Sequence, residues 1–306
     1  MAGLKVIKTK IRSIEKTQTV TKAMEAVSAA KMRKAQTTAL AGRAYAKAAV
    51  SILARVSGTQ ALKNNALMDD RTVNKALYIV ITSDKGLAGA LNSAVLRGTA
   101  SDIQSRNLTK EQVSIIAVGR KAHDFFLARG FAVDVYHPNT EELTSEVMAQ
   151  IVTEAASRFA TGTVDLVTIA YQHFVSTFEQ RPTVRTIFPL SLESLGRVVH
   201  DIIPARGAFA EASREPQTNS NAYTVEPTEE EVFAAILPKL ASIFVSHALL
   251  ESQASEHSAR MVAMKSASDK AEEMEHSLTL QFNKARQAAI TREVSEITGG
   301  MEAMAA

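Results

Sequence analysis

Residues 4–56 decide the fold, and they read LKVIKTKIRSIEKTQTVTKAMEAVSAAKMRKAQTTALAGRAYAKAAVSILARV. The stretch contains no proline, and Gly42 is its only glycine, a residue that costs about 1 kcal/mol relative to alanine inside a helix. A 3-4-3 spacing of aliphatic residues opens it, which is typical of the narrow apolar seam of a coiled coil. The residues at this spacing are Leu4, Ile7, Ile11 and Ile14.

The seam changes character after these residues. Gln18 and Thr21 occupy the next seam positions, so we expect the apolar stripe to pass to Val20, Met24 and Val27. Alanines dominate the remainder, which would let another helix approach closely. At ~1.5 Å per residue the stretch predicts a rod of roughly 80 Å. Such a rod needs a partner helix, because it cannot fold back into one core.

The partner lies at the other end of the chain. Helical periodicity runs from residue 228 to 298, or about 100 Å at ~1.5 Å per residue. Pro238 should bend this helix, and Gly299 with Gly300 should end it. The expected inward stripe comprises Phe233, Ile236, Leu237, Leu240, Phe244, Met261, Met264, Phe282, Ala285, Ala289, Ile290, Val294 and Ile297.

Between the two rods, strands alternate with helices. We expect strands at 76–82, 113–118, 131–136, 165–174 and 181–188, the last able to run antiparallel to its predecessor, and helices at 87–97 (Leu87 inward), 120–129 and 141–159. This alternation is typical of an α/β domain on a mostly parallel sheet. The fold class is therefore α/β with a long antiparallel coiled coil. The N- and C-terminal helices pair, and a central Rossmann-like domain is inserted between them.

The corresponding domain organisation has four parts. They are an N-terminal coiled-coil helix at 1–57, a central α/β domain at 75–190, a loop-rich connection at 191–227 and a C-terminal coiled-coil helix at 228–298.

Composition narrows the functional classes. The chain of 306 residues is 46% apolar and 22% charged and has no cysteine, which excludes disulfides, thiolate catalysis and cysteine zinc sites. It has no run of 18 apolar residues, so we expect no membrane span. The first residues show neither a secretory signal nor a transit peptide.

Charge is distributed unevenly along the chain. Residues 1–60 hold twelve basic and two acidic side chains, whereas residues 226–306 hold seven basic and thirteen acidic ones. A basic helix fits a solvated face, an acidic protein partner, nucleic acid or an acidic membrane.

No stretch predicts an active site. The turn at 83–89, SDKGLAG, follows a strand and precedes a helix, a geometry that can hold an anion. It matches neither the phosphate-loop pattern nor the GxGxxG fingerprint, so we interpret it as structural. The seven histidines show no metal-binding spacing. We expect no catalytic residues, cofactor or metal.

Several motifs, in this order along the chain, resemble the gamma subunit, the central rotor stalk, of F-type ATP synthases. They are Ile14 with TKAMEAV at 21–27 and AKMRKA at 30–35, SDKGL at 83–87 with Gly89, Leu91 and Asn92, EHSARMVAMK at 256–265, and NKARQAAIT at 283–291. The resemblance spans essentially the whole chain.

The resemblance implies a rotor shaft that couples a proton-driven membrane ring to conformational change at beta-subunit sites for ATP synthesis or hydrolysis. Its implied partners are alpha and beta subunits, the epsilon subunit and the c-ring, without nucleic acid or membrane insertion, at the cytoplasmic face of the bacterial inner membrane. The implied beta-subunit contacts are Lys22, Met24, Lys31, Arg33, Arg260, Arg286, Gln287 and Thr291, and the implied membrane-ring contacts are Tyr223 and Glu226.

Two alternatives remain at this stage. A coiled-coil tether could bind nucleic acid through its basic helix, but Tyr45 is the only aromatic residue in that segment. A nucleotide-dependent enzyme would need a genuine phosphate loop, which the turn at 83–89 does not supply.

Overall fold

The computed structural model describes residues 2–41, 65–140, 143–191 and 228–305. The predicted helical stretch at 42–57, all but the first residue of the predicted connection at 191–227, and both Tyr223 and Glu226 lie outside the described residues. The chain divides into two compact units, one formed by residues 1–29 with 260–306 and the other by residues 30–259. Two long helices, α1 (Ala2–Ala41) and α8 (Glu229–Ala305), contribute to both units.

The larger unit is built on a five-stranded sheet in the order β3-β2-β1-β4-β5. The pairs β1–β2, β1–β4 and β2–β3 are parallel, and β4–β5 is antiparallel. The predicted α/β fold with an antiparallel last strand is thus confirmed. The strands are β1 (Ala76–Ile81), β2 (Val113–Val118), β3 (Ala132–His137), β4 (Leu166–Phe174) and β5 (Gln180–Phe188).

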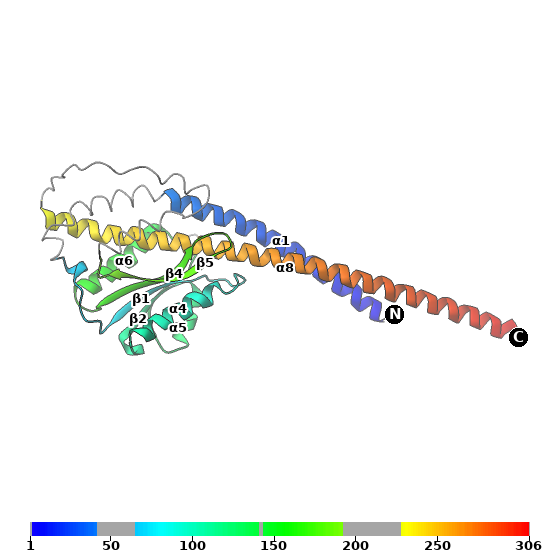
Figure 1. Cartoon of the computed structure of the whole chain (residues 1–306). Coiled ribbons are helices and arrows are strands. Elements are labelled where there is room, and N and C mark those ends of the chain that lie inside the picture. The colour runs from blue at the N-terminus through cyan, green and yellow to red at the C-terminus, as the bar shows by residue number, and fades with distance from the viewer. Residues whose placement is uncertain (1, 42–64, 141–142, 192–227, 306) are drawn as a thin grey trace. The chain divides into compact units, whose positions relative to one another are not determined.

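Helices cover both faces of this sheet (Figure 1). Helices α4 (Leu91–Ser105) and α5 (Arg120–Leu127) lie on one face, and α6 (Ser145–Ala160) with the first part of α8 lies on the other. Short 3-10 helices, η1 (Ala66–Met68) and η2 (Lys110–Gln112), precede β1 and β2. Every residue of β1 is buried, because a strand covered on both faces has no solvent side.

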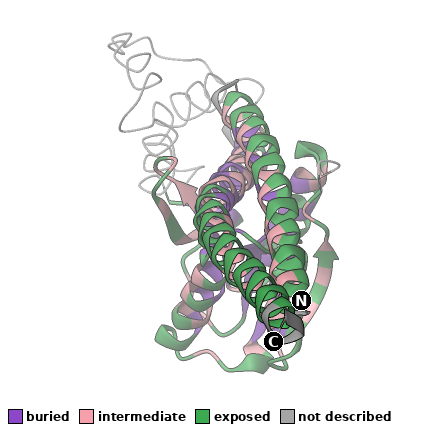
Figure 2. Ribbon diagram, turned by 90° about the vertical axis from the view of Figure 1, so that its right-hand side faces the viewer, coloured by how far each residue is buried: buried purple, intermediate pink, exposed green. Residues whose placement is uncertain are grey.

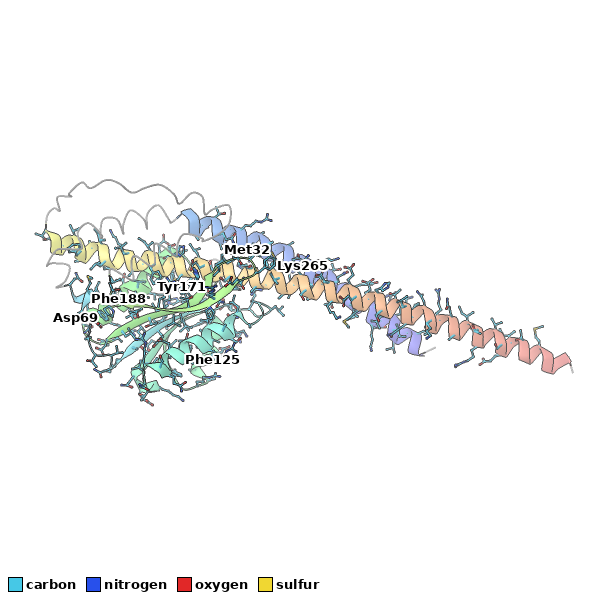
Figure 3. All side chains as sticks on the ribbon, in the orientation of Figure 1. Met32, Asp69, Phe125, Tyr171, Phe188 and Lys265 are labelled. Carbon is cyan, nitrogen blue, oxygen red and sulfur yellow. The ribbon has the colours of Figure 1, made fainter. Side chains whose placement is uncertain are left out.

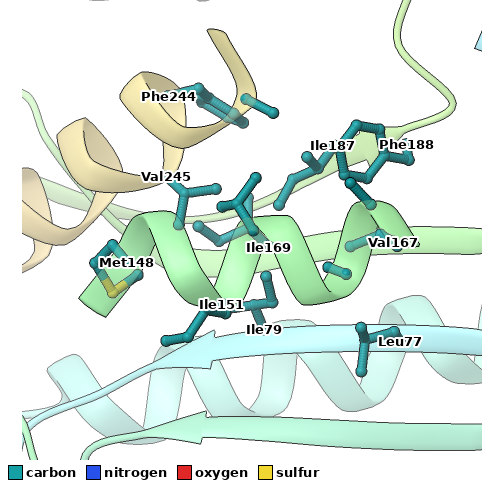
Figure 4. Packing of buried hydrophobic residues seen from close by; sticks show 14 of the residues in the cluster. Leu77, Ile79, Met148, Ile151, Val167, Ile169, Ile187, Phe188, Phe244 and Val245 are labelled. Carbon is teal, nitrogen blue, oxygen red and sulfur yellow. The ribbon is translucent and has the colours of Figure 1, made fainter. Parts of the chain in front are cut away.

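The α8 face contains the larger apolar cluster. Leu77, Ile79 and Ile81 of β1 point into it together with α6 residues such as Met148 and Ile151 (Figure 4). Helix α8 completes the cluster with an inward stripe that is buried to at least 93% at every position: Phe233, Leu237, Leu240, Ala241, Phe244, Val245, Ala248 and Leu249. The predicted inward stripe of this helix is therefore confirmed over its first part.

Helix α8 also bears on the expectation that the chain has no membrane span. Among the described residues, one helix is long and apolar enough to cross a membrane by length and composition, and it lies within α8. Of its most apolar 18-residue window, 44% is buried inside the protein. The apolar composition thus has a cause within the fold, namely packing on the sheet.

Several helix boundaries differ from the sequence prediction. Helix α4 ends at Ser105 rather than at residue 97, α5 ends at Leu127 rather than at 129, and α6 begins at Ser145 rather than at 141. Helix α4 begins at Leu91 rather than at residue 87. Leu87 was expected to point inward, but it has φ 63° and is 62% exposed. The preceding turn extends to Ala90, while Leu91, Val95 and Leu96 are buried as expected. Helix α8 also runs through Pro238, and it continues past Gly299 and Gly300 to Ala305. Glycine permits a left-handed cap but does not impose one.

The buried Tyr78 side chain makes the stability of the fold depend on pH in the alkaline range. This side chain lies on the α4 side of the sheet. Its hydroxyl donates to Asp102 Oδ2 at 2.7 Å, and Arg106 Nε donates to the same carboxylate at 2.9 Å. Burial, followed by the hydrogen bond and charge of Asp102, raises the pKa of Tyr78 above its ordinary value of 10.0.

A raised tyrosine pKa means that the fold stabilises the neutral phenol. Its contribution is fully present below a pH of about 10 and is lost as the pH rises further, because only the unfolded chain then releases the proton readily. We expect the free energy of unfolding, measured with urea between pH 8 and 11, to fall less steeply above pH 10 in Tyr78→Phe than in the unmodified chain. Equal slopes would contradict this assignment.

Candidate functional surface

The turn that was interpreted as structural, residues 83–89, is filled by the protein's own polar groups. Asp84 Oδ1 accepts a hydrogen bond from the backbone N–H of Arg120, the first residue of α5, at 2.7 Å. Ser83 N donates to Asn92 Oδ1 at 3.0 Å, and Asn92 Nδ2 donates to Ser83 Oγ at 2.7 Å. The Asp84 carboxylate thus lies at the N-terminus of α5, whereas Ser83 and Asn92 bond each other between the turn and the first turn of α4. This arrangement favours a structural role and gives no support to a nucleotide enzyme.

No other feature of the described residues points to local chemistry. Within that part of the chain, no group of three or more His, Asp or Glu side chains is placed to hold a metal ion. The acidic start of α8 includes a helix-capping contact, in which Glu231 N donates to Thr228 Oγ1 at 3.3 Å. The remaining candidate for function is the surface of the two long helices.

The smaller unit is an antiparallel coil of α1 and α8. Thr21 Oγ1 and Ser268 Oγ share a buried hydrogen bond at 2.6 Å. Gln18 Nε2 donates to Glu272 Oε2 at 3.2 Å, and Lys22 Nζ lies 4.0 Å from the same oxygen. Because Lys22 and Glu272 are both exposed, their ion pair contributes little stability.

The coil seam does not pass to valines, as the sequence had suggested. Val20 is 57% exposed and Val27 is 55% exposed, whereas Thr21 and Ser28 are buried. In a coiled coil, the residues that face the partner helix repeat every 3.5 positions on average. The position of a residue in this repeat, rather than its hydrophobicity, therefore decides here which side chains are buried. Met24 is half-buried, between these two patterns.

Among the described residues, no helix lies opposite the last part of α8. Counting along the antiparallel pair from Thr21 and Ser268 places Leu4 opposite Ala285. Most residues of α8 from 286 onward are exposed (Figure 2), and their side chains project from a lone helix (Figure 3). The expected coil stripe at Ile290, Val294 and Ile297 is therefore exposed, because these residues lie beyond the part of α8 that pairs with Ala2–Ala41.

These uncovered residues form one apolar strip along α8. Ile290, Val294, Ile297 and Met301 are 53%, 54%, 59% and 67% exposed. Their 4-3-4 spacing keeps them on one side of the helix. We call this set the tip strip. The sequence offered its periodicity, but that signal alone could not distinguish an uncovered strip from a coil seam.

The described contact candidates differ in accessibility. Lys22, Lys31, Arg33, Arg286, Gln287 and Thr291 are exposed. Arg260 is only 8% exposed, so within this chain it is the least accessible of the set. Arg286, Gln287 and Thr291 lie beside the tip strip, because each is three or four residues from Ile290 or Val294 and residues at that spacing are neighbours on a helix surface. The Thr291 hydroxyl donates to the Gln287 carbonyl at 3.0 Å.

The chain thus combines two structural units, an antiparallel two-helix coil and an α/β sheet unit. Comparison with known proteins identifies the family. The family model described as ATP synthase matches residues 3–304. A protein named ATP synthase gamma chain, from Heliobacterium modesticaldum, is 37% identical over 305 residues, covering 99% of this chain and all of that protein. The chain belongs to the gamma-chain family of ATP synthases.

Solved structures agree in fold. A chain of the Euglena gracilis mitochondrial ATP synthase, in a structure of the OSCP, F1 and c-ring, matches with a TM-score of 0.63 at 18% identity. The match covers 99% of this chain and 95% of that chain. A chain from the central stalk and c-ring structure of the Tetrahymena thermophila mitochondrial enzyme matches with a TM-score of 0.59 at 24% identity, covering 81% and 99% respectively.

Family membership makes this chain a homologue of the gamma subunit, a component of the membrane-associated ATP synthase complex. The alternative of a nucleic-acid tether receives no support from these comparisons.

Proposed function

We propose that this chain is the non-catalytic rotor shaft of a proton-translocating F-type ATP synthase. In this proposal a hexamer of alpha and beta subunits encloses the coil, while the epsilon subunit and the c-ring bind the foot. The complex then stands at the cytoplasmic face of a bacterial inner membrane. The gamma chain of Heliobacterium modesticaldum, which matches along its full length, supports this assignment.

The tip strip is the observation that carries the proposal. Contiguous apolar surface on a soluble protein marks an interaction site, and no described residue of this chain covers these four side chains. Apolar contacts are non-directional. An apolar strip on this helix therefore suits a surrounding apolar protein surface within which the helix can rotate. We assign the few directional contacts, namely hydrogen bonds and ion pairs to the partner, to Arg286, Gln287 and Thr291 beside the strip.

Basic residues supply the second part of the proposed contact. Lys22, Lys31 and Arg33 are exposed on α1, and residues 1–60 carry a large excess of basic over acidic side chains. Exposed cations of this kind favour acidic protein loops as partners. We assign them, together with Met24, to the beta subunits. Arg260 joins them only if its buried guanidinium becomes accessible in the complex. Tyr223 and Glu226 remain proposed contacts of the membrane ring.

Co-purification tests the proposal directly. A tag placed in the α/β unit should recover alpha and beta subunits in excess over this chain, together with ATPase activity. Recovery of nucleic acid, or of the chain alone with its own nucleotide turnover, would exclude the rotor assignment.

The polar contacts beside the tip strip have their own test. We expect Arg286→Ala combined with Gln287→Ala to lower the ATPase rate of the assembled complex about fivefold, equivalent to roughly 1 kcal/mol. Arg292→Ala is the matched control, because Arg292 is also exposed but lies roughly 120° around the helix from Arg286. A control that lowers the rate as much as the double variant would show that general charge, not these two side chains, is responsible.

A further inference from the structure

One layer of the coil is polar where coiled coils are ordinarily apolar. The layer consists of Gln18 and Thr21 on α1 with Ser268 and Glu272 on α8, and we call it the polar layer. Thr21 is 8% exposed and Ser268 is 2% exposed. Their hydroxyls bond each other at 2.6 Å, and Gln18 bonds Glu272 at 3.2 Å. Hydrogen bonds, rather than interlocked aliphatic side chains, join the helices at this point.

The coil is apolar on the far side of this layer. Seam positions toward the N-terminus of α1 are Ile7, Ile11 and Ile14, and the half-buried positions opposite them on α8 include Leu278, Phe282 and Ala285. Ile14 and Leu278 line the same shallow groove between the two helices. This apolar part loses much more apolar surface to water on opening than a Thr–Ser contact does.

The two parts therefore resist separation unequally. When the helices part at the polar layer, each hydroxyl, amide and carboxylate exchanges its internal hydrogen bond for one to water, and the net loss is small. When they part in the apolar section, aliphatic side chains become exposed with nothing to replace the contact. Opening is consequently least costly at the polar layer.

The middle of α8 is held in the same manner within the larger unit. Ser255 Oγ donates to the Gln172 carbonyl at 3.2 Å, and Ser258 Oγ donates to the Thr177 carbonyl at 2.6 Å. Buried α8 residues between 251 and 260 are mainly serine and charged residues, whereas those between 233 and 249 are apolar. Polar contacts thus extend along α8 between its two apolar sections.

We propose that the polar layer is a soft point built into the coil, at which α1 and α8 separate locally while the apolar section stays closed. This inference goes beyond the rotor function, since it concerns the coil itself and holds whatever partner surrounds the chain. It gives the shaft a defined place to change its twist or bend without loss of the whole pair.

Hydrogen exchange of the full-length chain, followed by mass spectrometry, tests the proposal. The variant Thr21→Val with Ser268→Ala replaces the Thr21 hydroxyl with a methyl group and removes the Ser268 hydroxyl. We expect amide exchange in peptides covering 17–28 and 264–275 to slow by about threefold to tenfold, with little change at 278–289. Thr19→Val is the matched control, because Thr19 is exposed and its hydroxyl bonds only the Glu15 carbonyl at 2.9 Å.

A converse variant completes the test. Ile11→Thr introduces a hydroxyl into the apolar section opposite Leu278, and we expect exchange at 278–289 to accelerate by a similar factor. Circular dichroism would establish that each variant keeps its helical content. Unchanged or faster exchange at the polar layer of the double variant would overturn the proposal, as would an effect of equal size in Thr19→Val.

Discussion

Gly119→Ala is expected to destabilise the α/β unit by on the order of 4 kcal/mol or more. Gly119 follows β2 with φ 95°, a conformation that side chains with a Cβ rarely adopt. An added Cβ would lie 2.1 Å from the Thr82 carbonyl oxygen and 2.6 Å from its carbonyl carbon. Both contacts are with backbone, which cannot turn aside as a flexible side chain can.

The consequences would spread because the ends of three strands meet at this residue. Gly119 N donates to the His137 carbonyl at 2.8 Å, and Thr82 N donates to the Val118 carbonyl at 2.7 Å. Thr82 Oγ1 also accepts from Ala122 N of α5 at 2.9 Å. Any movement that relieves the clash therefore breaks contacts among β1, β2, β3 and α5.

Urea unfolding monitored by circular dichroism measures this effect, with Gly86→Ala as its control. A Cβ on Gly86 would meet nothing within 4 Å, and no left-handed φ is required there. We expect that control to change the free energy of unfolding by less than about 1 kcal/mol. Similar unfolding midpoints for the two variants would show that the close approach of Gly119 to Thr82 is not maintained in solution.

Phe233→Ala is the second large effect that we expect, at about 3–5 kcal/mol. Phe233 lies in the first turns of α8, is 1% exposed, and belongs to the apolar cluster between α8, α6 and the sheet. Removing its ring would leave a cavity beneath a helix that is held in place by that cluster. The start of α8 should then detach more readily.

The matched control is Phe178→Ala, because Phe178 is 84% exposed in the turn between β4 and β5. We expect it to shift the free energy of unfolding by no more than about 0.5 kcal/mol. Thermal and urea unfolding of both variants provide the comparison. A loss below about 1 kcal/mol in Phe233→Ala would mean that the first turns of α8 do not rest on the sheet.

Much of the fold was predictable because backbone periodicity is local. Strand β2 was predicted with its observed bounds. Strands β1, β4 and β5 differ by one residue at one end, and β3 differs by one residue at both ends. The apolar stripe of Phe233, Leu237, Leu240 and Phe244 was also predicted, because apolar residues that recur every 3.6 positions lie on one face of a helix. Family motifs along the chain then indicated the gamma-chain family, which the comparisons confirm.

The candidate surface was less predictable, because exposure depends on a second element. Val20 and Val27 were expected in the coil but are exposed, while Thr21 and Ser28 are buried in their place. Nothing in the local sequence states where the partner helix lies. The contacts proposed for Lys22, Lys31, Arg33, Arg286, Gln287 and Thr291 rest on the family resemblance and stay predictions. The double variant described above tests two of them, Arg286 and Gln287.

The sequence alone determined that this protein has two long terminal helices around a strand–helix alternation, because those features follow from residue periodicity within each segment. Only the tertiary structure decided that Thr21 meets Ser268 and that Ile290, Val294, Ile297 and Met301 lie beyond the start of α1. The physical reason is that the alignment of α1 against α8 decides which apolar residues are covered. These two helices are separated by most of the chain, so neither local sequence specifies that alignment. The same repeat therefore produces a coil seam where α1 is present and an uncovered strip where it is not.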